Sequence, residues 1–447
     1  MTRRSRTAST PPPPPGTIHD PPSQDPPWTP PRLFLFRFGL LYLGLFSLAT
    51  QITGSMIPNL AFTYRGFGRL WPMRDITHQV ASSVFGVTSR LDDVSAGEPP
   101  FFWSQTLWLL VVSLLAAAAW SAFDRRRHGH PTLLAWFRLF VRLALAAALF
   151  EYGMTKVIPT QFPAPSLATL VTPVGDLTLS ALLWTSIGAA PAYEIFTGCV
   201  EVLAGVLLLL PRTAALGAAI GLGALIQVFA LNMTYDVGLK LVTFHLIVLA
   251  LIVLAPSLQP LADFFLRDRP GIPRPEPIPV RSPQARRVLF VAQLVFGAYL
   301  LGMYTHINLR FWEVGGGGQP RSALYGVWNV EELAVDGQVR PAETNDYDRR
   351  WRRVIFDEPD RLVIQRTDDS LATFGASIDT RRNVVALTKG TSRTWGAAFT
   401  FVREPGGGLT LEGEMDGQRI EARLRLVETE AFPLLNSTFR WMRTHEP

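Results

Sequence analysis

The chain has 447 residues, of which 48% are hydrophobic and only 17% are charged. This hydrophobic share is high for a soluble protein of this length and typical of a chain with membrane-embedded and soluble parts. The net charge is +6, but the arginines are concentrated in loops between apolar segments, where they set membrane orientation rather than indicate nucleic-acid binding. The single cysteine, Cys199, excludes a disulfide framework and a cysteine-based metal site.

The N-terminal segment 1–31 is basic and then rich in proline. It carries too little apolar surface to fold, so we expect a disordered cytoplasmic tail. The first apolar run, 33–57, follows a leader that is too long for an ordinary signal peptide and lacks an A-x-A cleavage site. We therefore predict that this run stays in the protein as a signal-anchor helix.

Seven long apolar runs indicate a polytopic α-helical membrane bundle. Most approach the roughly 20 residues that a helix needs to cross about 30 Å of hydrocarbon. The predicted spans are 33–57, 105–123, 133–152, 193–210, 214–231, 240–255 and 287–306. We divide the membrane part into a region 32–132 with two spans and a long external loop, a core 133–266, and a region 267–318 with a cytoplasmic loop, the last span and a Gly-rich linker.

Arginine placement predicts the orientation of the bundle. Arginines cluster before the first span, in the connections after the second and fourth spans, and before the seventh. We expect these segments to lie in the cytoplasm of a bacterial cell with the bundle in the inner membrane. An odd number of spans then sends the C-terminal part to the periplasmic or extracellular side.

The C-terminal region 319–447 has the period-two pattern of β-strands. Short alternating runs with Gly, Asp and Pro turns predict strands at 351–358, 361–366, 383–389, 397–402, 409–415 and 419–427. A further strand begins at Gly326-Val327-Trp328, and Asp416-Gly417 is a hairpin-turn signal. Closure removes exposed strand edges, so we expect an antiparallel β-barrel of about eight strands.

Ionisable residues in the third and fourth spans are the strongest functional signal, because a charge in hydrocarbon needs a partner or a polar cavity. Arg142 and Glu151 lie inside the third span, and Lys156 lies at its outer end before Pro159 stops the helix. In the fourth span, Glu194 and Glu201 share one helix face, and we expect Lys156 to contact one of the two. Gly198 and Gly205 lie on a similar stripe of this span, where they allow a neighbouring helix to approach closely.

More polar residues gather where the fifth span turns into the sixth: Asn232, Asp236, Lys240 and His245. We expect them near the same outer leaflet as Lys156 and Glu194, while the inner halves of these spans, apart from Arg142, are closed by Ala, Leu and Val. The result is a polar chamber with one open end. For Asp236 and Lys240 a solvated i, i+4 pair is the simpler interpretation, and for His245 a hydrogen-bonded packing histidine. The sequence contains none of the usual metal or nucleotide motifs.

The stretch 138–256 resembles the four-helix DoxX family of bacterial membrane proteins. The resemblance is carried by residues in the family's order: Arg142, Gly153, Lys156, Glu194, Gly198, Glu201 and Arg212. The G-x-W strand resembles the start of lipocalin-like barrels, and with the ending TFRWMRTHEP it resembles the tail of a long DoxX-like subgroup.

The resemblance implies a redox link, because relatives include the membrane subunit of thiosulfate:quinone oxidoreductase. The wider group is distantly similar to the transmembrane part of vitamin K-dependent gamma-carboxylase, whose base towards a hydroquinone is a lysine at the end of a G-x-x-K helix. Gly153-Met154-Thr155-Lys156 matches that pattern.

Two functions compete. In the first, the chamber binds a quinone or another amphipathic small molecule, and a redox partner protein takes part. Lys156 and Glu201 are then the catalytic candidates, while the expected ligand-binding residues are Arg142, Glu151, Glu194, Asn232, Asp236, Lys240 and His245. A direct Lys156–Glu201 pair would keep the lysine protonated and weaken its role as a base. In the second, the protein is a non-enzymatic carrier or chaperone whose external barrel binds a hydrophobic ligand or a partner protein.

Overall fold

The computed structural model describes residues 28–58, 66–87, 98–127, 129–270, 278–341, 346–347, 349–390, 392–428 and 432–436. Most of the expected disordered tail and the ending TFRWMRTHEP lie outside these residues.

The described residues hold seven helices that are long and apolar enough to cross a membrane, which makes the chain a multi-pass membrane protein. They are α1 (Pro30–Ala49), α4 (Pro100–Phe123), α5 (Pro131–Val157), α8 (Pro191–Leu209), α9 (Ala214–Thr234), α10 (Lys240–Arg267) and α11 (Pro283–Gly315). Each predicted span corresponds to one of these helices, so the predicted bundle is confirmed.

The first, sixth and seventh predicted spans differ most from the observed helices, the seventh because α11 extends from Pro283 to Gly315. The first breaks at Thr50, whose backbone is extended, and continues as the short α2 (Gln51–Met56). The sixth is longer than predicted, because α10 runs on through Pro256 and Pro260 to Arg267. Proline is tolerated there because neighbouring groups in a membrane helix can satisfy the backbone groups that it frees.

Several short elements in the connections were not predicted, because a few residues show no reliable periodicity and such helices depend on tertiary packing. They are η1 (Phe67–Arg69), α3 (Met73–Phe85), α6 (Leu167–Val171), η2 (Val174–Asp176), α7 (Leu179–Gly188) and α12 (Pro433–Asn436). α6 and α7 both lie in the connection between α5 and α8. They matter for function because α6 contacts the barrel and α7 lines a cavity.

The C-terminal region forms an antiparallel sheet in which neighbouring strands pair along the chain and β1 also pairs with β9. β2 pairs with β1 only, which leaves a closed barrel of eight strands. The strands are β1 (Gly326–Val335), β2 (Gln338–Val339), β3 (Trp351–Phe356), β4 (Arg361–Arg366), β5 (Leu371–Asp379), β6 (Val384–Lys389), β7 (Ser392–Glu404), β8 (Gly408–Met415) and β9 (Gln418–Leu426). The predicted barrel is confirmed; the strands that the sequence pattern did not show are β5 and the two-residue β2.

The barrel interior is filled by apolar side chains that form a single cluster around Trp328, Phe356, Phe399 and Phe401. Trp328 also donates from Nε1 to the Leu324 carbonyl at 2.9 Å. An eight-stranded barrel is just wide enough for its own side chains to fill it, and this one is filled in that way.

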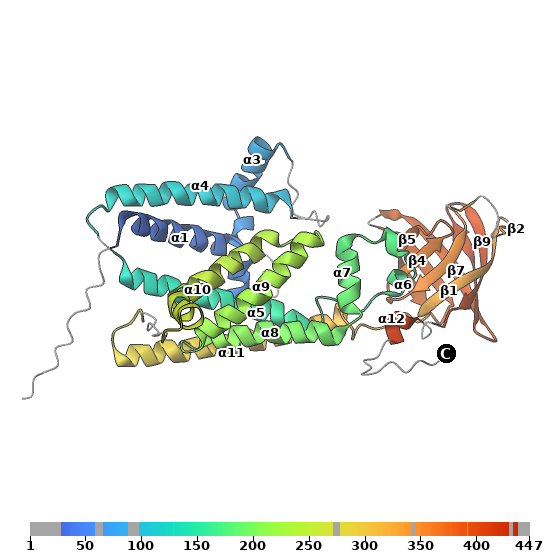
Figure 1. Cartoon of the computed structure of the whole chain (residues 1–447). Coiled ribbons are helices and arrows are strands. Elements are labelled where there is room, and N and C mark those ends of the chain that lie inside the picture. The colour runs from blue at the N-terminus through green and yellow to red at the C-terminus, as the bar shows by residue number, and fades with distance from the viewer. Residues whose placement is uncertain are drawn as a thin grey trace, which may run out of the picture.

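The barrel lies beyond one end of the helical bundle, with α6 and α7 between them (Figure 1). Leu167 of α6 is buried against Val327, Ile355 and Val363 on the outer wall of the barrel. The Leu167 backbone N–H donates to Asp357 Oδ2 at 2.7 Å, and Gln365 Nε2 donates to the Val171 carbonyl at 3.0 Å. The connection between α5 and α8 therefore attaches the barrel to the bundle.

Candidate functional site

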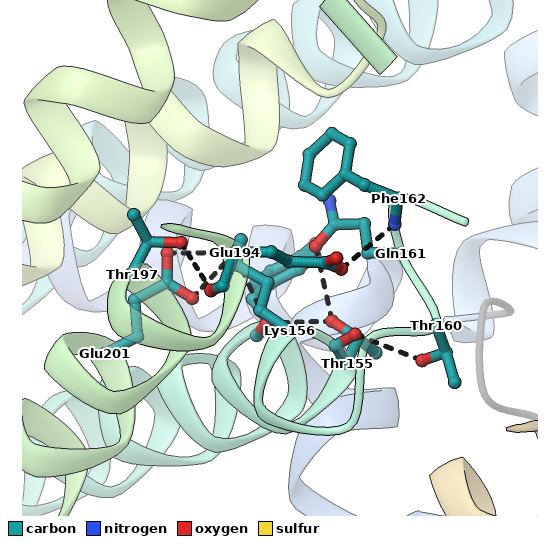
Figure 2. Close-up of polar contacts among 9 residues, drawn as sticks. Thr155, Lys156, Thr160, Gln161, Phe162, Glu194, Thr197 and Glu201 are labelled. Carbon is teal, nitrogen blue, oxygen red and sulfur yellow. Dashed lines mark hydrogen bonds and ion pairs between the residues drawn. The ribbon is translucent and has the colours of Figure 1, made fainter. Parts of the chain in front are cut away.

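The predicted contact between Lys156 and an acidic residue is confirmed, and the partner is Glu201. Lys156 Nζ lies 2.9 and 2.7 Å from the two carboxylate oxygens of Glu201, and both side chains are almost fully buried. The ammonium also donates to the Tyr152 carbonyl at 3.3 Å. Figure 2 shows the pair between α5 and α8. A buried pair with two short hydrogen bonds satisfies both charges where neither could stay alone.

Two glycines bring the pair together, because α5 and α8 touch at their backbones. A Cβ atom on Gly198 would lie 2.6 Å from the Gly153 carbonyl oxygen and 2.7 Å from Lys156 Cβ. A Cβ atom on Gly153 would lie 2.8 Å from Val202 Cγ2. Each charged residue of the pair follows its glycine by three positions, so glycine and charge share one face of each helix.

A cavity opens beside the pair, at the end of the bundle that faces the barrel. Its void space is about 910 Å³, part of which belongs to the open mouth. The polar lining comes from the Lys156–Glu201 pair and from Tyr152, Gln161, Tyr193, Thr197, Gln227, Asn232 and Thr243, whereas Leu, Ile, Val, Phe and Trp side chains form the rest. A mostly apolar pocket with a few convergent polar groups is the usual form of a small-molecule site.

The cavity is covered by the chain that follows α5. Thr155 accepts the backbone N–H groups of Thr160 and Gln161 at its carbonyl, which turns the chain back over the helix end. Phe162 then packs against Trp184 of α7 with ring centroids 5.0 Å apart. Both aromatic residues line the cavity, so α7 and this turn form its cover.

Glu194 lies next to the cavity and is fully buried (Figure 2). Its Oε1 accepts the backbone N–H of Phe162 at 3.1 Å, while Oε2 has no hydrogen-bond partner among the described residues. Glu194 therefore ties α8 to the cover, and its second oxygen is buried without a hydrogen-bond partner among the described residues. Glu194 is not among the described residues that line the cavity.

Glu151 faces away from the cavity, towards α2. It accepts a hydrogen bond from the Ser55 hydroxyl, and Ser55 in turn accepts from Tyr304 at its carbonyl at 2.9 Å. Gln51 of α2 donates to the Tyr152 hydroxyl. Tyr152 therefore joins the α2 network to the wall of the cavity.

His245 and Arg142 also lie away from the cavity. His245 stacks on Phe46 with ring centroids 3.5 Å apart, Nδ1 lies 2.6 Å from the Leu241 carbonyl and Nε2 lies 2.8 Å from the Tyr42 hydroxyl. These contacts are those of a hydrogen-bonded packing histidine. Arg142 donates to Gln293 of α11 and lies three to four helix turns from Lys156, about 21 Å along α5.

Of the predicted residues at the turn between α9 and α10, the structure brings Asn232 to the cavity. Asn232 Nδ2 donates to Thr243 Oγ1 at 3.2 Å, and both residues line the wall. Asp236 and Lys240 instead form an i, i+4 pair at 2.7 Å, with the Asp236 side chain 58% exposed.

Sequence reasoning missed Glu98, whose Oε2 accepts the backbone N–H groups of Lys240 at 2.5 Å and Leu241 at 3.4 Å. It therefore caps the start of α10 from the distant 58–104 loop. Tyr152 and Thr197 were missed too, although each precedes a member of the ion pair by four residues and so shares its helix face. The sequence did not indicate Trp184 as a site residue, because the helix that carries it, α7, was not predicted.

The described residues contain no group of three or more His, Cys, Asp or Glu side chains that could hold a metal ion. The candidate site is built from one ion pair, amides, hydroxyls and aromatic rings.

Comparison with known proteins finds one significant relative among curated proteins, the uncharacterized protein YwoB of Bacillus subtilis (strain 168). The two are 35% identical over 164 residues, which is 95% of YwoB and 36% of this chain. The chain belongs to the YwoB family. No protein-family model and no solved structure matches it. The name YwoB carries no function, and most of the chain lies outside the match.

Proposed function

We propose that this YwoB-family protein binds an amphipathic small molecule, of which a quinone is our preferred example, in the cavity beside the Lys156–Glu201 pair. The observation that carries the proposal is a buried ion pair set into the wall of a largely apolar cavity. A ligand with a polar head and an apolar body matches both kinds of surface, because the head can bond to the pair and the amides while the body contacts Leu and Trp side chains.

Within this proposal, Lys156 acts first as a binding group. Its ammonium donates to both oxygens of Glu201, and this pair of hydrogen bonds holds the side chain in the cavity wall. Lys156 becomes a base only if the ligand or a proton transfer to Glu201 breaks the pair. Glu194, with one oxygen lacking a partner among the described residues, is the group best placed to exchange a proton with the pair.

The resemblance to the DoxX family supports the redox version of the proposal, in which the ligand is a quinone and a partner protein supplies or takes electrons. Gly153 and Lys156 of the G-x-x-K pattern both lie at the site, Gly153 at the helix contact and Lys156 in the cavity wall. We further propose that the cavity end of the bundle faces the outside of a bacterial inner membrane, because the Arg-rich connections lie at the opposite helix ends.

The barrel is the weaker candidate for the ligand site, because its interior is filled by its own side chains. A ligand inside it would have to displace aromatic residues such as Phe399 and Phe401, at a cost of several kcal/mol for each buried ring. In our proposal the barrel therefore acts through its outer wall, which already contacts α6.

The test is mass spectrometry of lipophilic molecules that co-purify with the full chain in mild detergent. We expect a bound amphiphile in the unmodified protein and its loss in Val228→Trp, which fills the cavity but leaves the ion pair in place. Glu201→Gln should also lose the ligand. Glu151→Gln is the matched control, because it removes a buried carboxylate from the same bundle outside the cavity, and it should keep the ligand.

An ion pair that only fixes helix packing gives a different pattern. In that case Glu201→Gln loses thermal stability, and neither it nor Val228→Trp changes the content of lipophilic molecules. Recovery of folded Val228→Trp and Glu201→Gln proteins with unchanged ligand content would contradict the proposal.

A further inference from the structure

A second cavity lies at the other end of the bundle and shares no lining residue with the first. It lies between α5, the turn from α8 to α9, α10 and the start of α11. Its void space is about 1850 Å³, including its open mouth. It is therefore a separate site on the molecule.

Four arginines line this second cavity: Arg138, Arg142, Arg212 and Arg286. They come from three different parts of the chain, and no acidic side chain occurs among the described residues that line it. Arg212 and Arg286 are exposed near the mouth, whereas Arg142 is buried about 16 Å along α5 from Pro131. Positive charge thus continues from the mouth into the interior.

The remaining wall is mostly apolar. Leu139, Val253 and Phe290 face the same space as the arginines, and Gln293 sits at its inner end, where it accepts from Arg142. A free inorganic anion would use the arginines and leave this apolar wall without a partner. A molecule that uses both surfaces carries a negative head and at least one hydrocarbon chain.

We propose that the second cavity binds an amphiphile whose phosphate-bearing head has a net negative charge, with the phosphate on Arg212 and Arg286 and the hydrocarbon chain against Phe290 and Val253. Basic pockets between membrane helices are known sites for anionic lipid headgroups, and guanidinium groups hold phosphate oxygens through paired hydrogen bonds. The proposal does not depend on the chamber beside Lys156, because the two cavities share no residue.

The chain offers a matched pair of variants for the test. Arg286 and Arg287 are neighbours at the start of α11 and both are exposed, but Arg286 lines the cavity and Arg287 does not. Delipidated full-length protein is titrated with phosphatidylglycerol, phosphatidylcholine or inorganic phosphate, and binding is followed by native mass spectrometry and thermal stability. We expect phosphatidylglycerol to bind and Arg286→Gln to weaken it about fivefold, since one basic side chain near a lipid surface is worth about 1 kcal/mol.

Arg287→Gln should change the affinity less than twofold. Ala215→Trp, which fills the cavity without altering its charge, should weaken phosphatidylglycerol binding as well. Equal losses in the two arginine variants would show attraction to a basic surface and overturn the proposal. Equal binding of phosphatidylcholine would overturn it too. Stabilisation by inorganic phosphate as strong as that by phosphatidylglycerol would identify a free-anion site and reject the lipid.

Discussion

The bundle and the barrel fill their interiors in different ways. The barrel interior is one apolar cluster of side chains from its own strands, whereas the bundle keeps a cavity with a buried ion pair in its wall. Eight strands close around a space that side chains fill completely. Helices that touch at glycines in one place and separate in another leave space for a cavity between them. In our proposal the ligand site therefore lies in the bundle, and the barrel contacts the bundle connection through its outer wall.

The largest expected effect comes from separating α5 and α8. Gly198→Leu should destabilise the protein by at least about 4 kcal/mol and eliminate the Lys156–Glu201 pair, because even a Cβ atom at residue 198 overlaps the α5 backbone. Thermal unfolding in detergent measures the loss. Gly223→Leu on α9 is the control, since nothing lies within 4 Å of a Cβ atom there. Equal stability of the two variants would refute the glycine contact.

The next effect tests the barrel alone. Trp328→Ala should cost about 3 kcal/mol, because it leaves a large void in a filled interior. The damage should stay in the barrel, so any amphiphile bound in the bundle should remain. Val402→Ala, at a position 62% exposed on β7, should have little effect. Loss of bound ligand in Trp328→Ala would mean that the barrel takes part in binding.

A smaller effect is expected where the two regions meet. Leu167→Ala should weaken the contact between α6 and the barrel by about 2 kcal/mol, because Leu167 is buried against Val327, Ile355 and Val363. Hydrogen exchange of the α6 amides should rise, while strand amides stay protected. Leu179→Ala, at a position 56% exposed on α7, is the control. Unchanged exchange in α6 would indicate that other contacts hold the barrel.

The smallest effect concerns pH. Burial raises the pKa of Glu98 above its ordinary value of 4.5, although the hydrogen bonds from Lys240 and Leu241 oppose the shift. The folded protein therefore binds this proton more strongly than the unfolded chain. The stability that this stronger proton binding contributes is fully present below pH 4.5, the ordinary pKa of the group. It is lost as the pH rises through the raised pKa of Glu98 in the folded protein. Glu98→Gln should flatten the pH dependence of thermal stability there; an unaltered curve would contradict the shift.

Much of the fold could be predicted from local sequence patterns. Six strand runs and seven apolar runs correspond to observed elements, and the Asp416-Gly417 turn has the two positive φ angles, 52° and 77°, that this hairpin signal requires. A contact of Lys156 with Glu201 or Glu194 was predictable as well, because deep opposite charges in hydrocarbon need each other, and the structure shows Glu201 as the partner. The candidate ligand residues were predicted less well: Asn232 lines the chamber, whereas His245 and Glu151 face other helices.

The sequence by itself thus determined how many helices are long and apolar enough to cross a membrane, where a barrel follows, and that Lys156 pairs with Glu201 or Glu194. These properties depend on the local periodicity of the chain and on the high free energy of an isolated charge in hydrocarbon. Only the tertiary structure decided that Arg142 and Lys156 belong to different cavities, that Trp184 covers one of them and that Glu98 caps α10. These features depend on how each helix is rotated and on which distant segment lies against it. Packing between elements determines the rotation of each helix and its distant neighbours, and no local sequence pattern predicts either.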